Sequence, residues 1–453
     1  MEHISTMLPQ DGPEKIGRIK QFEKPEKPVY FNEWQKVIKN NFPDLLFPAE
    51  IGLSIIAQIL IKEITNPFAL VLVDVPAAGK TIVVNFFDGI EGLTYATDKF
   101  TPASFVTNSP SVSRDQIEKV DLLPRIRYKM FLLRDMATMF SKKEEHLTEL
   151  LGLLTRVLDG EGLDTESGVH GQRGYKGEYL FMMLGASTPI SPKIFKIMGN
   201  LGSRLFFLRM NSRNKTDEEL VKQLKSKAYK GKETACREIT NAFVKTLWSE
   251  NPNGIIWNNE NDPEDVMTII ARCSGLLAKL RGAVNVWSSD DWGETKYSYA
   301  TPTIEKSDRI NQLLYNQCRG YALVHGRKQI ERSDLKATIE LCFDSGYTSR
   351  SSLFRALIDY NGIMKTNEVE KKLNQSKPTA LKEMNTLEIL GICNIAKESR
   401  GGVGQPEEEI HLKKEFEWFI SNECREIRGL SPLPSTTTEK PSDPHTGPIH
   451  FIN

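Results

Sequence analysis

Residues 68–87 carry the pattern that most restricts how this chain can fold. A continuous apolar run of strand length, Phe68 to Val73, ends in a turn made of Pro, Ala and Gly, and Gly79-Lys80-Thr81 then opens a helical apolar pattern. This order predicts a strand, a phosphate-binding loop and a helix. In such loops the backbone N–H groups point at phosphate oxygens, and the dipole of the following helix favours anions.

The predicted loop departs from the pattern G-x-x-x-x-G-K-[ST] at one position, where Asp74 replaces the first glycine. The chemistry requires amides, a cation for the outer phosphates, and a hydroxyl for Mg²⁺. We therefore expect the loop to bind ATP, with Mg²⁺ as cofactor; the alternative is a strand-to-helix turn without a ligand. The candidates are Ala77, Ala78 and Gly79 for the amides, Lys80 for the cation and Thr81 for the hydroxyl.

The composition is typical of a soluble globular protein with several domains. At 453 residues the chain is long enough for two to four domains of roughly 150 residues each. Lys plus Arg equals Asp plus Glu at 59 each, so any affinity for nucleic acid has to come from local patches. The six cysteines are scattered singly without a C-x-x-C pair, which argues against zinc and disulfides and fits a reducing compartment.

Neither targeting nor membrane insertion is predicted. Residues 1–20 are polar and lack the apolar core of a signal peptide. The apolar run Leu53 to Ile61 is interrupted by Gln58 and is too short to span a bilayer. We therefore expect a cytoplasmic protein without a membrane segment.

A second apolar run, Lys129 to Ala137, contains an acid near its end, Asp135, which follows Arg134. In phosphate-loop ATPases the strand next to the loop strand ends in a carboxylate that holds Mg²⁺, usually followed by a second carboxylate that activates water. The single acid here predicts support for a metal and leaves the general base open. The alternative is a surface acid that caps the strand.

Three further runs complete a predicted sheet. Thr94 to Thr107 has a short strand pattern, Tyr179 to Ala186 is a buried-strand run followed by Ser187 and Thr188, and Ser203 to Arg209 is the last run. A polar side chain after the second run would lie beside the γ-phosphate if that strand neighbours the loop strand. Five short apolar strands alternating with helices predict a parallel α/β sheet with helices on both faces.

A glycine-rich stretch, residues 162–177, follows a predicted amphipathic helix and predicts a hairpin or a mobile loop. It carries three basic side chains and one aromatic, so it could touch a phosphate backbone or a protein substrate. The alternative is a solvated hairpin. The candidate contact residues are His170, Arg173 and Lys176.

The order of these parts resembles an AAA+ ATPase. Within that superfamily it looks like the branch with an extra hairpin before the fourth strand, which includes minichromosome-maintenance helicases, MoxR-type ATPases and magnesium chelatase subunits. Leu150 to Gly162 resembles the helix before that hairpin, and Tyr179 to Pro189 resembles the sensor 1 strand. Residues 202–207 are similar to the Ser-Arg-Phe arginine-finger motif of the minichromosome-maintenance group. The resemblance covers roughly residues 45–345.

The resemblance implies ATP hydrolysis at the junctions between subunits of a ring or helical homo-oligomer. A finger arginine stabilises transition-state charge at the γ-phosphate held by a neighbouring subunit, so it acts only in trans. A salt bridge at the strand edge is the alternative for this arginine. The implied residues are Asp135 as the Walker B acid, Thr188 or Ser187 as sensor 1, Arg204 as the finger, and Arg309, with Arg281 in reserve, as sensor 2.

Composition and periodicity, together with the parts that the resemblance implies, divide the chain into five predicted parts. Its first residues are rich in Lys, Glu and Pro without periodicity, and its last are rich in Ser, Thr and Pro. A hairpin is also predicted between Asn285 and Tyr299. The parts are a flexible arm (1–30), an AAA+ nucleotide-binding core (31–212), an all-α lid (213–345), a small winged-helix domain (346–426) and a disordered tail (427–453).

The winged-helix prediction comes from three short helical patterns followed by two strand patterns. In this resemblance the third helix faces a DNA groove and the wing touches a phosphate. Positive and negative charges nearly balance in this part, and winged helices also bind proteins, so a protein partner is the alternative. The implied contact residues are Lys377, Thr379 and Lys382 on the third helix and Arg400 on the wing.

Together these patterns predict an oligomeric AAA+ ATPase that acts on DNA as a helicase, translocase or loader. Two alternatives stay open. One is a protein-remodelling ATPase of the MoxR type, which would lack salt-sensitive DNA binding. The other is a nucleotide-gated DNA-binding switch with little turnover, because Asp74 and the single acid Asp135 depart from the usual pattern.

Overall fold

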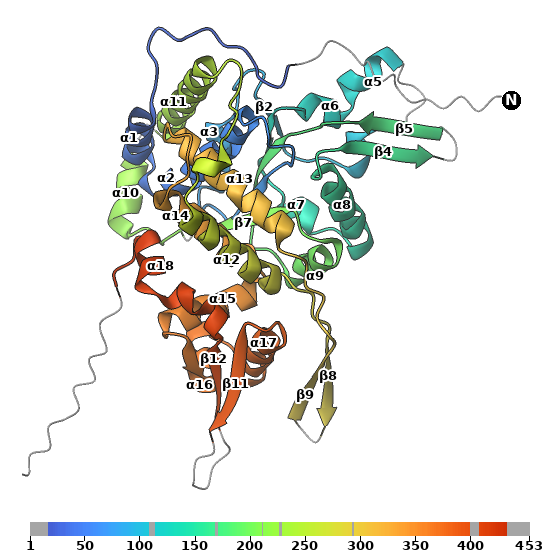
Figure 1. Ribbon diagram of the computed structural model, residues 1–453, viewed down its shortest axis with the longest axis vertical. Coiled ribbons are helices and arrows are strands. Elements are labelled where there is room, and N and C mark those ends of the chain that lie inside the picture. The colour runs from blue at the N-terminus through green and yellow to red at the C-terminus, as the bar shows by residue number, and fades with distance from the viewer. Residues whose placement is uncertain are drawn as a thin grey trace, which may run out of the picture.

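The computed structural model has one parallel sheet at its centre (Figure 1). The apolar runs form its strands because two flanking layers bury them, and β1, β3 and β6 are completely buried. The strands are β1 (Ala69–Val73), β2 (Thr94–Thr97), β3 (Met130–Leu133), β6 (Met182–Ser187) and β7 (Leu205–Arg209). The structure describes residues 17–107, 114–167, 171–210, 212–225, 229–291, 294–398 and 407–432.

The strand order across the sheet is β2-β3-β6-β1-β7, and every pair is parallel. The prediction of a five-stranded parallel α/β sheet is therefore confirmed, and it is consistent with a phosphate-loop fold. Val73 at the end of β1 pairs with Ser187 on one side and with Arg209 on the other. The carboxyl ends of these strands therefore meet at one sheet edge, where ligands of open α/β sheets bind.

Helices cover both faces of the sheet (Figure 1). The helices before and within the sheet region are α1 (Phe31–Asn41), α2 (Leu46–Ala57), α3 (Lys80–Phe86), α4 (Pro102–Phe105), α5 (Arg114–Val120), α6 (Leu122–Ile126), α7 (Ala137–Phe140), α8 (Glu144–Val157) and α9 (Pro192–Leu201). Those that follow are α10 (Asp217–Lys225), α11 (Tyr229–Glu250), α12 (Glu264–Leu280), α13 (Asp308–Val324) and α14 (Leu335–Asp344). Short 3-10 helices are η1 (Pro43–Leu45), η2 (Gln58–Leu60), η3 (Asn259–Asn261), η4 (Arg332–Asp334) and η5 (Lys414–Ile420).

Strand β1 alternates its side chains between two hydrophobic cores. Leu70 and Leu72 belong to a core shared with α2, α12, α13 and α14, whereas Ala69, Val71 and Val73 belong to a core shared with α8 and α9. This alternation follows from the two-residue period of a strand. It explains why β1 reads as a continuous apolar run rather than an alternating one.

The predicted strand over Thr94–Thr107 is only partly correct. Residues 94–97 form β2, but Pro102 begins helix α4. Thr101 and Ser104 form a capping box at its start, and proline is well suited to the first helical position. Helix-start chemistry therefore overrides the β-branched composition of this stretch.

Residues 17–30, which precede the predicted boundary at residue 31, contact the body of the protein. Arg18 donates hydrogen bonds to four backbone carbonyls at the end of η2 and just after it, those of Ile59, Ile61, Lys62 and Ile64. The Val29 amide donates to Thr246 at 3.1 Å. Residues 17–30 thus lie against the fold, within the segment (1–30) for which a flexible arm was predicted.

Two hairpins project from the body in different directions (Figure 1). The first, β4 (Gly162–Ser167) with β5 (Gly171–Lys176), lies where a hairpin was predicted. Its base is fixed by Tyr175, whose hydroxyl donates to buried Asp121 at 2.8 Å. The second pairs β8 (Val286–Asp291) with β9 (Glu294–Tyr299), so the segment predicted as an all-α lid contains a two-stranded sheet.

Among the described residues, the C-terminal unit contains four α-helices and a three-stranded sheet with the order β10-β12-β11. Its last helix returns to the body, where Arg428 Nε donates to Glu340 at 2.7 Å and Glu423 pairs with Arg332 at 2.8 Å. The elements are α15 (Thr348–Asp359), β10 (Ile363–Lys365), α16 (Thr366–Leu373), α17 (Lys377–Ile389), β11 (Cys393–Glu398), β12 (Glu407–Leu412) and α18 (Asn422–Ile427).

One helical stretch in the described residues, Pro43–Leu60, is long and apolar enough to cross a membrane. It is 78% buried inside the protein, between β6 and α13. Its apolar composition is therefore explained by packing in the core.

Candidate functional site

The loop after β1, residues 74–79, has the backbone of an anion-binding concavity. Ala77 has φ 64° and Gly79 has φ 91°, on either side of Ala78, whose φ is not positive. Such alternation points successive N–H groups into one hollow. Among the described residues, no group accepts a hydrogen bond from the amides of Ala77, Ala78 or Gly79. These three predicted amide donors therefore fit a phosphate.

Lys80 is the first residue of helix α3, and its side chain lies against the loop. Its Nζ donates to the backbone carbonyls of Asp74 at 2.8 Å and Val75 at 2.6 Å, and the residue is only 8% exposed. Burial lowers the pKa of Lys80, and the charges of Asp74 and Asp135 oppose this effect. The ammonium group therefore lies at the loop, near both carboxylates that the sequence singled out.

Thr81 connects the loop to the end of β3. Its Oγ1 donates to the backbone carbonyl of Arg134 at 3.3 Å, beside Asp135. Asp135 is exposed, and its Oδ1 accepts from the Ala137 amide at 2.8 Å. Strand β3 is not adjacent to β1, because β6 lies between them. The Thr81 hydroxyl therefore comes near Asp135 through its hydrogen bond to Arg134, and not because β1 and β3 are neighbouring strands.

This pair of oxygen ligands suits Mg²⁺ bound with a nucleotide. Among the described residues no group of three His, Cys, Asp or Glu side chains could hold a metal by itself. Mg²⁺ is usually held by one or two protein oxygens together with phosphate oxygens and waters. Thr81 and Asp135 could supply the protein share of such a shell.

The sensor 1 candidates lie at the end of β6, the strand beside β1. Ser187 is 2% exposed, and its carbonyl accepts a hydrogen bond from the Asp74 amide. Thr188 is half-buried, one residue beyond the end of β6. Of the two, Thr188 is the more exposed residue.

Asp74 ties the loop to the chain that follows β7. Its Oδ1 accepts from the Val75 amide at 2.7 Å and its Oδ2 from the Ser212 amide at 2.9 Å. Partial burial raises the pKa of Asp74, but the hydrogen bonds from Ser212 and Val75 and the charge of Lys80 outweigh it, and the pKa is lowered. The carboxylate is therefore a structural acceptor here, which glycine could not be.

An aromatic cluster beside the loop was missed by sequence reasoning. The Phe42 ring packs 5.7 Å from Tyr229 in a T-shaped contact and 5.8 Å from Phe86. Next to it, Leu45 approaches the loop so closely that a methyl group at Gly79 would lie 2.9 Å from its Cδ2. Phe42, Leu45 and Tyr229 could form an apolar wall for a nucleobase. No local pattern connects residues so far apart in sequence.

The predicted finger Arg204 lies at the opposite sheet edge from the loop. It precedes β7, whose first residue Leu205 pairs with Ala69 at the start of β1. Five residues of strand place Arg204 about 16 Å from the loop edge. Arg204 is 8% exposed, and its guanidinium donates to Asp159 at 3.0 Å and to the Gly202 carbonyl. The ion pair that the sequence allowed as an alternative is thus present within one chain.

The two sensor 2 candidates lie at that same distant edge. A methyl group at Gly202 would lie 2.9 Å from Nη1 of Arg204 and 3.7 Å from Nη1 of Arg309. Arg281 is 4% exposed, donates to the carbonyls of Leu205 and Ser345, and stacks over Phe206 at 4.7 Å. Arg281 therefore joins α12 to β7. The structure brings neither arginine to the loop of its own chain.

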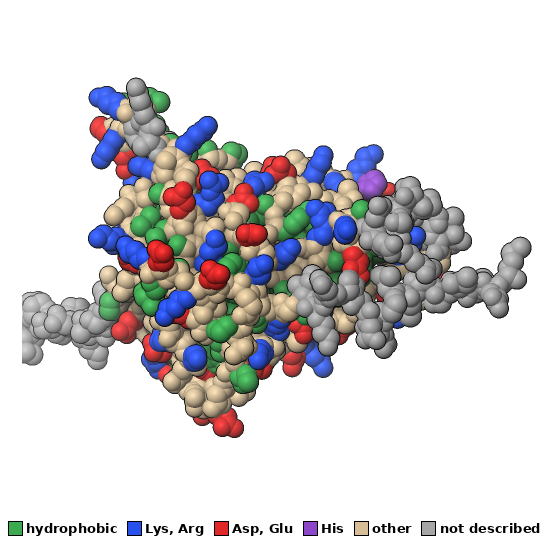
Figure 2. Space-filling view, turned by 90° about the horizontal axis from the view of Figure 1, so that it is seen from above, with side chains coloured by type: hydrophobic (Ala, Val, Ile, Leu, Met, Phe, Trp, Pro, Cys, Tyr) green, Lys and Arg blue, Asp and Glu red, His purple; other side chains and the backbone are tan. Residues whose placement is uncertain are grey.

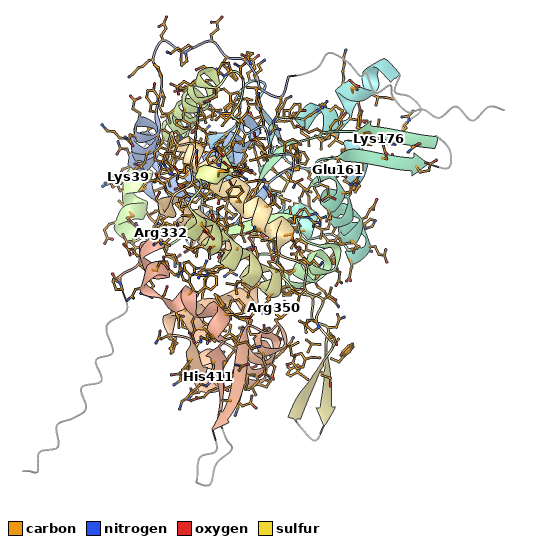
Figure 3. All side chains as sticks on the ribbon, in the orientation of Figure 1. Lys39, Glu161, Lys176, Arg332, Arg350 and His411 are labelled. Atoms are coloured by element: carbon orange, nitrogen blue, oxygen red, sulfur yellow. The ribbon has the colours of Figure 1, made fainter. Side chains whose placement is uncertain are left out.

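Two basic residues of hairpin β4–β5, Arg173 and Lys176, make contacts within the chain. Arg173 donates to the Thr107 carbonyl at 3.1 Å, and Lys176 pairs with Asp164 at 3.3 Å. Lys176 and His411 of the C-terminal unit lie at different ends of the molecule (Figure 3). The predicted contact residue His170 lies outside the described residues.

Helix α17 carries the contact residues predicted for the C-terminal unit. Lys377 is exposed at its first position, and the Thr379 hydroxyl bonds to Ser376 at 2.9 Å. Lys382 lies against hairpin β8–β9: its Nζ is 5.8 Å from the Tyr297 ring centroid, and its carbonyl accepts from Tyr299. Arg400 lies outside the described residues.

Basic and acidic side chains are interspersed on the face seen in Figure 2. This mixing matches the zero net charge of the chain, with 59 basic and 59 acidic residues. This face therefore does not carry a broad positive potential that would attract a nucleic acid.

No protein-family model matches this chain, and no curated protein matches it. Among solved structures, the apo A form of the NrS-1 C-terminal region is 12% identical with a TM-score of 0.29, covering 86% of this chain and 79% of that one. The Aeropyrum pernix Orc1 protein in complex with DNA is 14% identical with a TM-score of 0.21, covering 89% of this chain and 94% of that one. At these TM-scores the similarities carry no argument about family or function.

Proposed function

We propose that this chain is a Mg²⁺-dependent ATPase that works on DNA as an oligomer. The observation that carries the proposal is the grouping of Lys80, Thr81 and Asp135 at one edge of a parallel sheet, around a loop with alternating left-handed residues. A cation, a hydroxyl, a carboxylate and free amides are the groups that phosphoryl transfer requires.

Each group then has a role. Lys80 would exchange its contacts with loop carbonyls for the outer phosphates, and Thr81 with Asp135 would hold Mg²⁺. Thr188 would contact the γ-phosphate region from β6. Bound Mg²⁺ would neutralise charge on the phosphates during transfer.

The oligomer is part of the proposal because Arg204 cannot reach the loop of its own chain. It would complete a site in a neighbouring copy, at the cost of its pairing with Asp159. A guanidinium introduced at the γ-phosphate is worth about 10³–10⁵ in rate in other phosphate-loop enzymes. Arg309 lies beside Arg204 and would enter the same junction.

Contact with DNA is proposed for the winged-helix-like C-terminal unit and hairpin β4–β5. Exposed Lys377 at the start of α17 supports a phosphate contact there. His170 and Arg400 remain candidates from the sequence.

A second candidate function is a nucleotide-gated switch with little turnover. It is favoured by the residue after Asp135, which is buried Met136 rather than a second acid able to activate water. The Asp74 tether to Ser212 favours it too, because it restrains the loop.

The test is steady-state ATP hydrolysis by the wild-type chain, Lys80→Ala and Arg204→Ala, each with and without single-stranded and duplex DNA. The ATPase proposal expects turnover that DNA stimulates and that both substitutions abolish. ATP binding without turnover under any condition supports the switch instead.

A further inference from the structure

Asp74 places the beginning of the helical lid beside the phosphate loop. Strand β7 leaves the sheet at the loop edge, where the Met210 amide donates to the Val73 carbonyl at 3.2 Å. Two residues later the Ser212 amide donates to Asp74 Oδ2 at 2.9 Å. The next residue is Arg213. Asp74 therefore holds the backbone next to Arg213 beside the loop.

Arg213 is held in a replaceable ion pair. Its two terminal nitrogens donate to the Glu219 carboxylate at 2.8 and 2.6 Å. Both side chains are exposed, 58% for Arg213 and 40% for Glu219. Glu219 also accepts from the Thr216 amide at 3.0 Å, in the manner of a capping box, so it remains anchored when Arg213 leaves.

Two acidic side chains act on the charge of Arg213. The hydrogen bond and charge of Glu219, with a contribution from Asp44 on η1, raise the pKa of Arg213. The pairing also lowers the pKa of Glu219 to about 2. Asp44 precedes Leu45, which packs on the Gly79 position of the loop. Arg213 thus directly follows the residue that Asp74 tethers to the loop.

Two other arginines near the loop edge, Arg209 and Arg134, form ion pairs with other carboxylates. Arg209 pairs with buried Asp344 at 3.9 Å, and Arg134 pairs with Asp88 at 2.7 Å and with Asp98 at 3.3 Å. Arg309 and Arg281 lie at the opposite edge of the sheet.

We propose that Arg213 is the lid cation that contacts the terminal phosphate of a nucleoside triphosphate bound to the same chain, exchanging Glu219 for phosphate oxygens. The guanidinium fork binds phosphate with the same two-pronged geometry as a carboxylate. Asp74 acts as a positioning residue, because it holds Ser212. This inference rests on the proposed nucleotide site and adds a residue that the sequence pattern did not indicate.

The test is equilibrium binding of fluorescent ATP and ADP analogues, with Mg²⁺, to the full chain. Arg213→Ala should weaken ATP binding by about tenfold, the effect of losing a charge-assisted pair, and change ADP binding by less than about twofold. Glu219→Gln should strengthen ATP binding, because the competing charge is gone. Asp74→Gly should weaken ATP more than ADP. Lys222→Ala, which removes an exposed cation from the same helix α10, should change neither.

Equal losses for ATP and ADP in Arg213→Ala overturn the inference. So does a loss in Glu219→Gln that matches the loss in Arg213→Ala, since the ion pair would then have only a structural role. Both results leave the nucleotide site itself standing. If the wild-type chain binds neither analogue, the proposed function fails first and this inference fails with it.

Discussion

The carboxylate of Asp159 accepts hydrogen bonds from both Nε and Nη2 of Arg204, at 3.1 and 3.0 Å. Asp159 follows helix α8 and precedes hairpin β4–β5, so Arg204 is tied to the base of that hairpin. Burial lowers the pKa of Arg204; Asp159 opposes this, and nearby Arg309 adds to the lowering. A nucleotide in a neighbouring copy would compete with Asp159 for this guanidinium.

Mixing two inactive variants tests whether Arg204 acts in trans. Lys80→Ala and Arg204→Ala should each lower turnover by about 10³-fold. Their mixture should regain activity, because the intact loop of one variant meets the intact arginine of the other. Phosphate release is measured across mixing ratios. A mixture of Lys80→Ala with Thr81→Ala, both in the loop, is the control that should stay inactive; equal behaviour of the two mixtures contradicts the assignment.

Two glycines in helices should respond oppositely to alanine. In α13 a methyl group at Gly320 would lie 2.0 Å from the Ser54 carbonyl of α2. We expect Gly320→Ala to lower the free energy of unfolding by about 2–3 kcal/mol, since backbone cannot give way cheaply. In α12 Gly275 has nothing within 4 Å, so Gly275→Ala should raise it by about 0.5–1 kcal/mol. Urea denaturation measures both, and shifts of the same sign would contradict the packing of α13 on α2.

His325 should make stability depend on pH. Its ring packs 4.0 Å from Phe31 and 4.9 Å from Tyr321, and burial, reinforced by Arg327, lowers its pKa from 6.5 to about 4. As pH falls, His325 is therefore protonated near pH 6.5 in the unfolded chain but only near pH 4 in the folded chain. This contribution to stability is present above pH 6.5 and is lost as pH falls to about 4.

The measurement is the melting temperature of wild type and His325→Gln between pH 7 and pH 4. The variant should lose less stability than wild type over this window, because its side chain does not titrate. Parallel curves would mean that His325 does not contribute to the acid sensitivity of the fold.

Lys377 should contribute one ionic contact to DNA binding. We expect Lys377→Ala to weaken binding and to reduce the slope of log K against log salt concentration by about one. Lys222→Ala on α10 removes an equal charge from another surface and should leave the slope unchanged. Fluorescence anisotropy with labelled duplex from low to high salt measures both slopes. An unchanged slope in Lys377→Ala would show that Lys377 makes no ionic contact with DNA.

The strands, the loop and hairpin β4–β5 could be predicted from sequence because each depends on a local run. Lateral order depends on long-range pairing instead. Local patterns could not reveal that β6 lies between the loop strand and β3, which Asp135 follows, or that Arg309 lies beside Arg204 at the distant edge. The stretch at Thr101 shows the reverse case, where a local cap overrode strand propensity.

Other parts of the candidate site were hidden because their residues are distant in sequence. Phe42 and Tyr229 meet beside the loop only after α11 packs on α1, through contacts such as the Trp34 Nε1 hydrogen bond to Thr240 at 2.9 Å. Asp74 was recognised as a departure from the pattern, but its role could not be predicted. Its partner is a backbone amide, Ser212, and backbone amides leave no signature in sequence.

The central claim is that residues 74–81 form a nucleotide site, and calorimetric titration of Mg-ATP tests it most directly. Wild type should bind one ATP per chain, and Lys80→Ala should bind about 10- to 100-fold more weakly while keeping the same circular dichroism spectrum. A folded wild-type chain that takes up no ATP, or a Lys80→Ala variant that binds as tightly as wild type, would contradict the account.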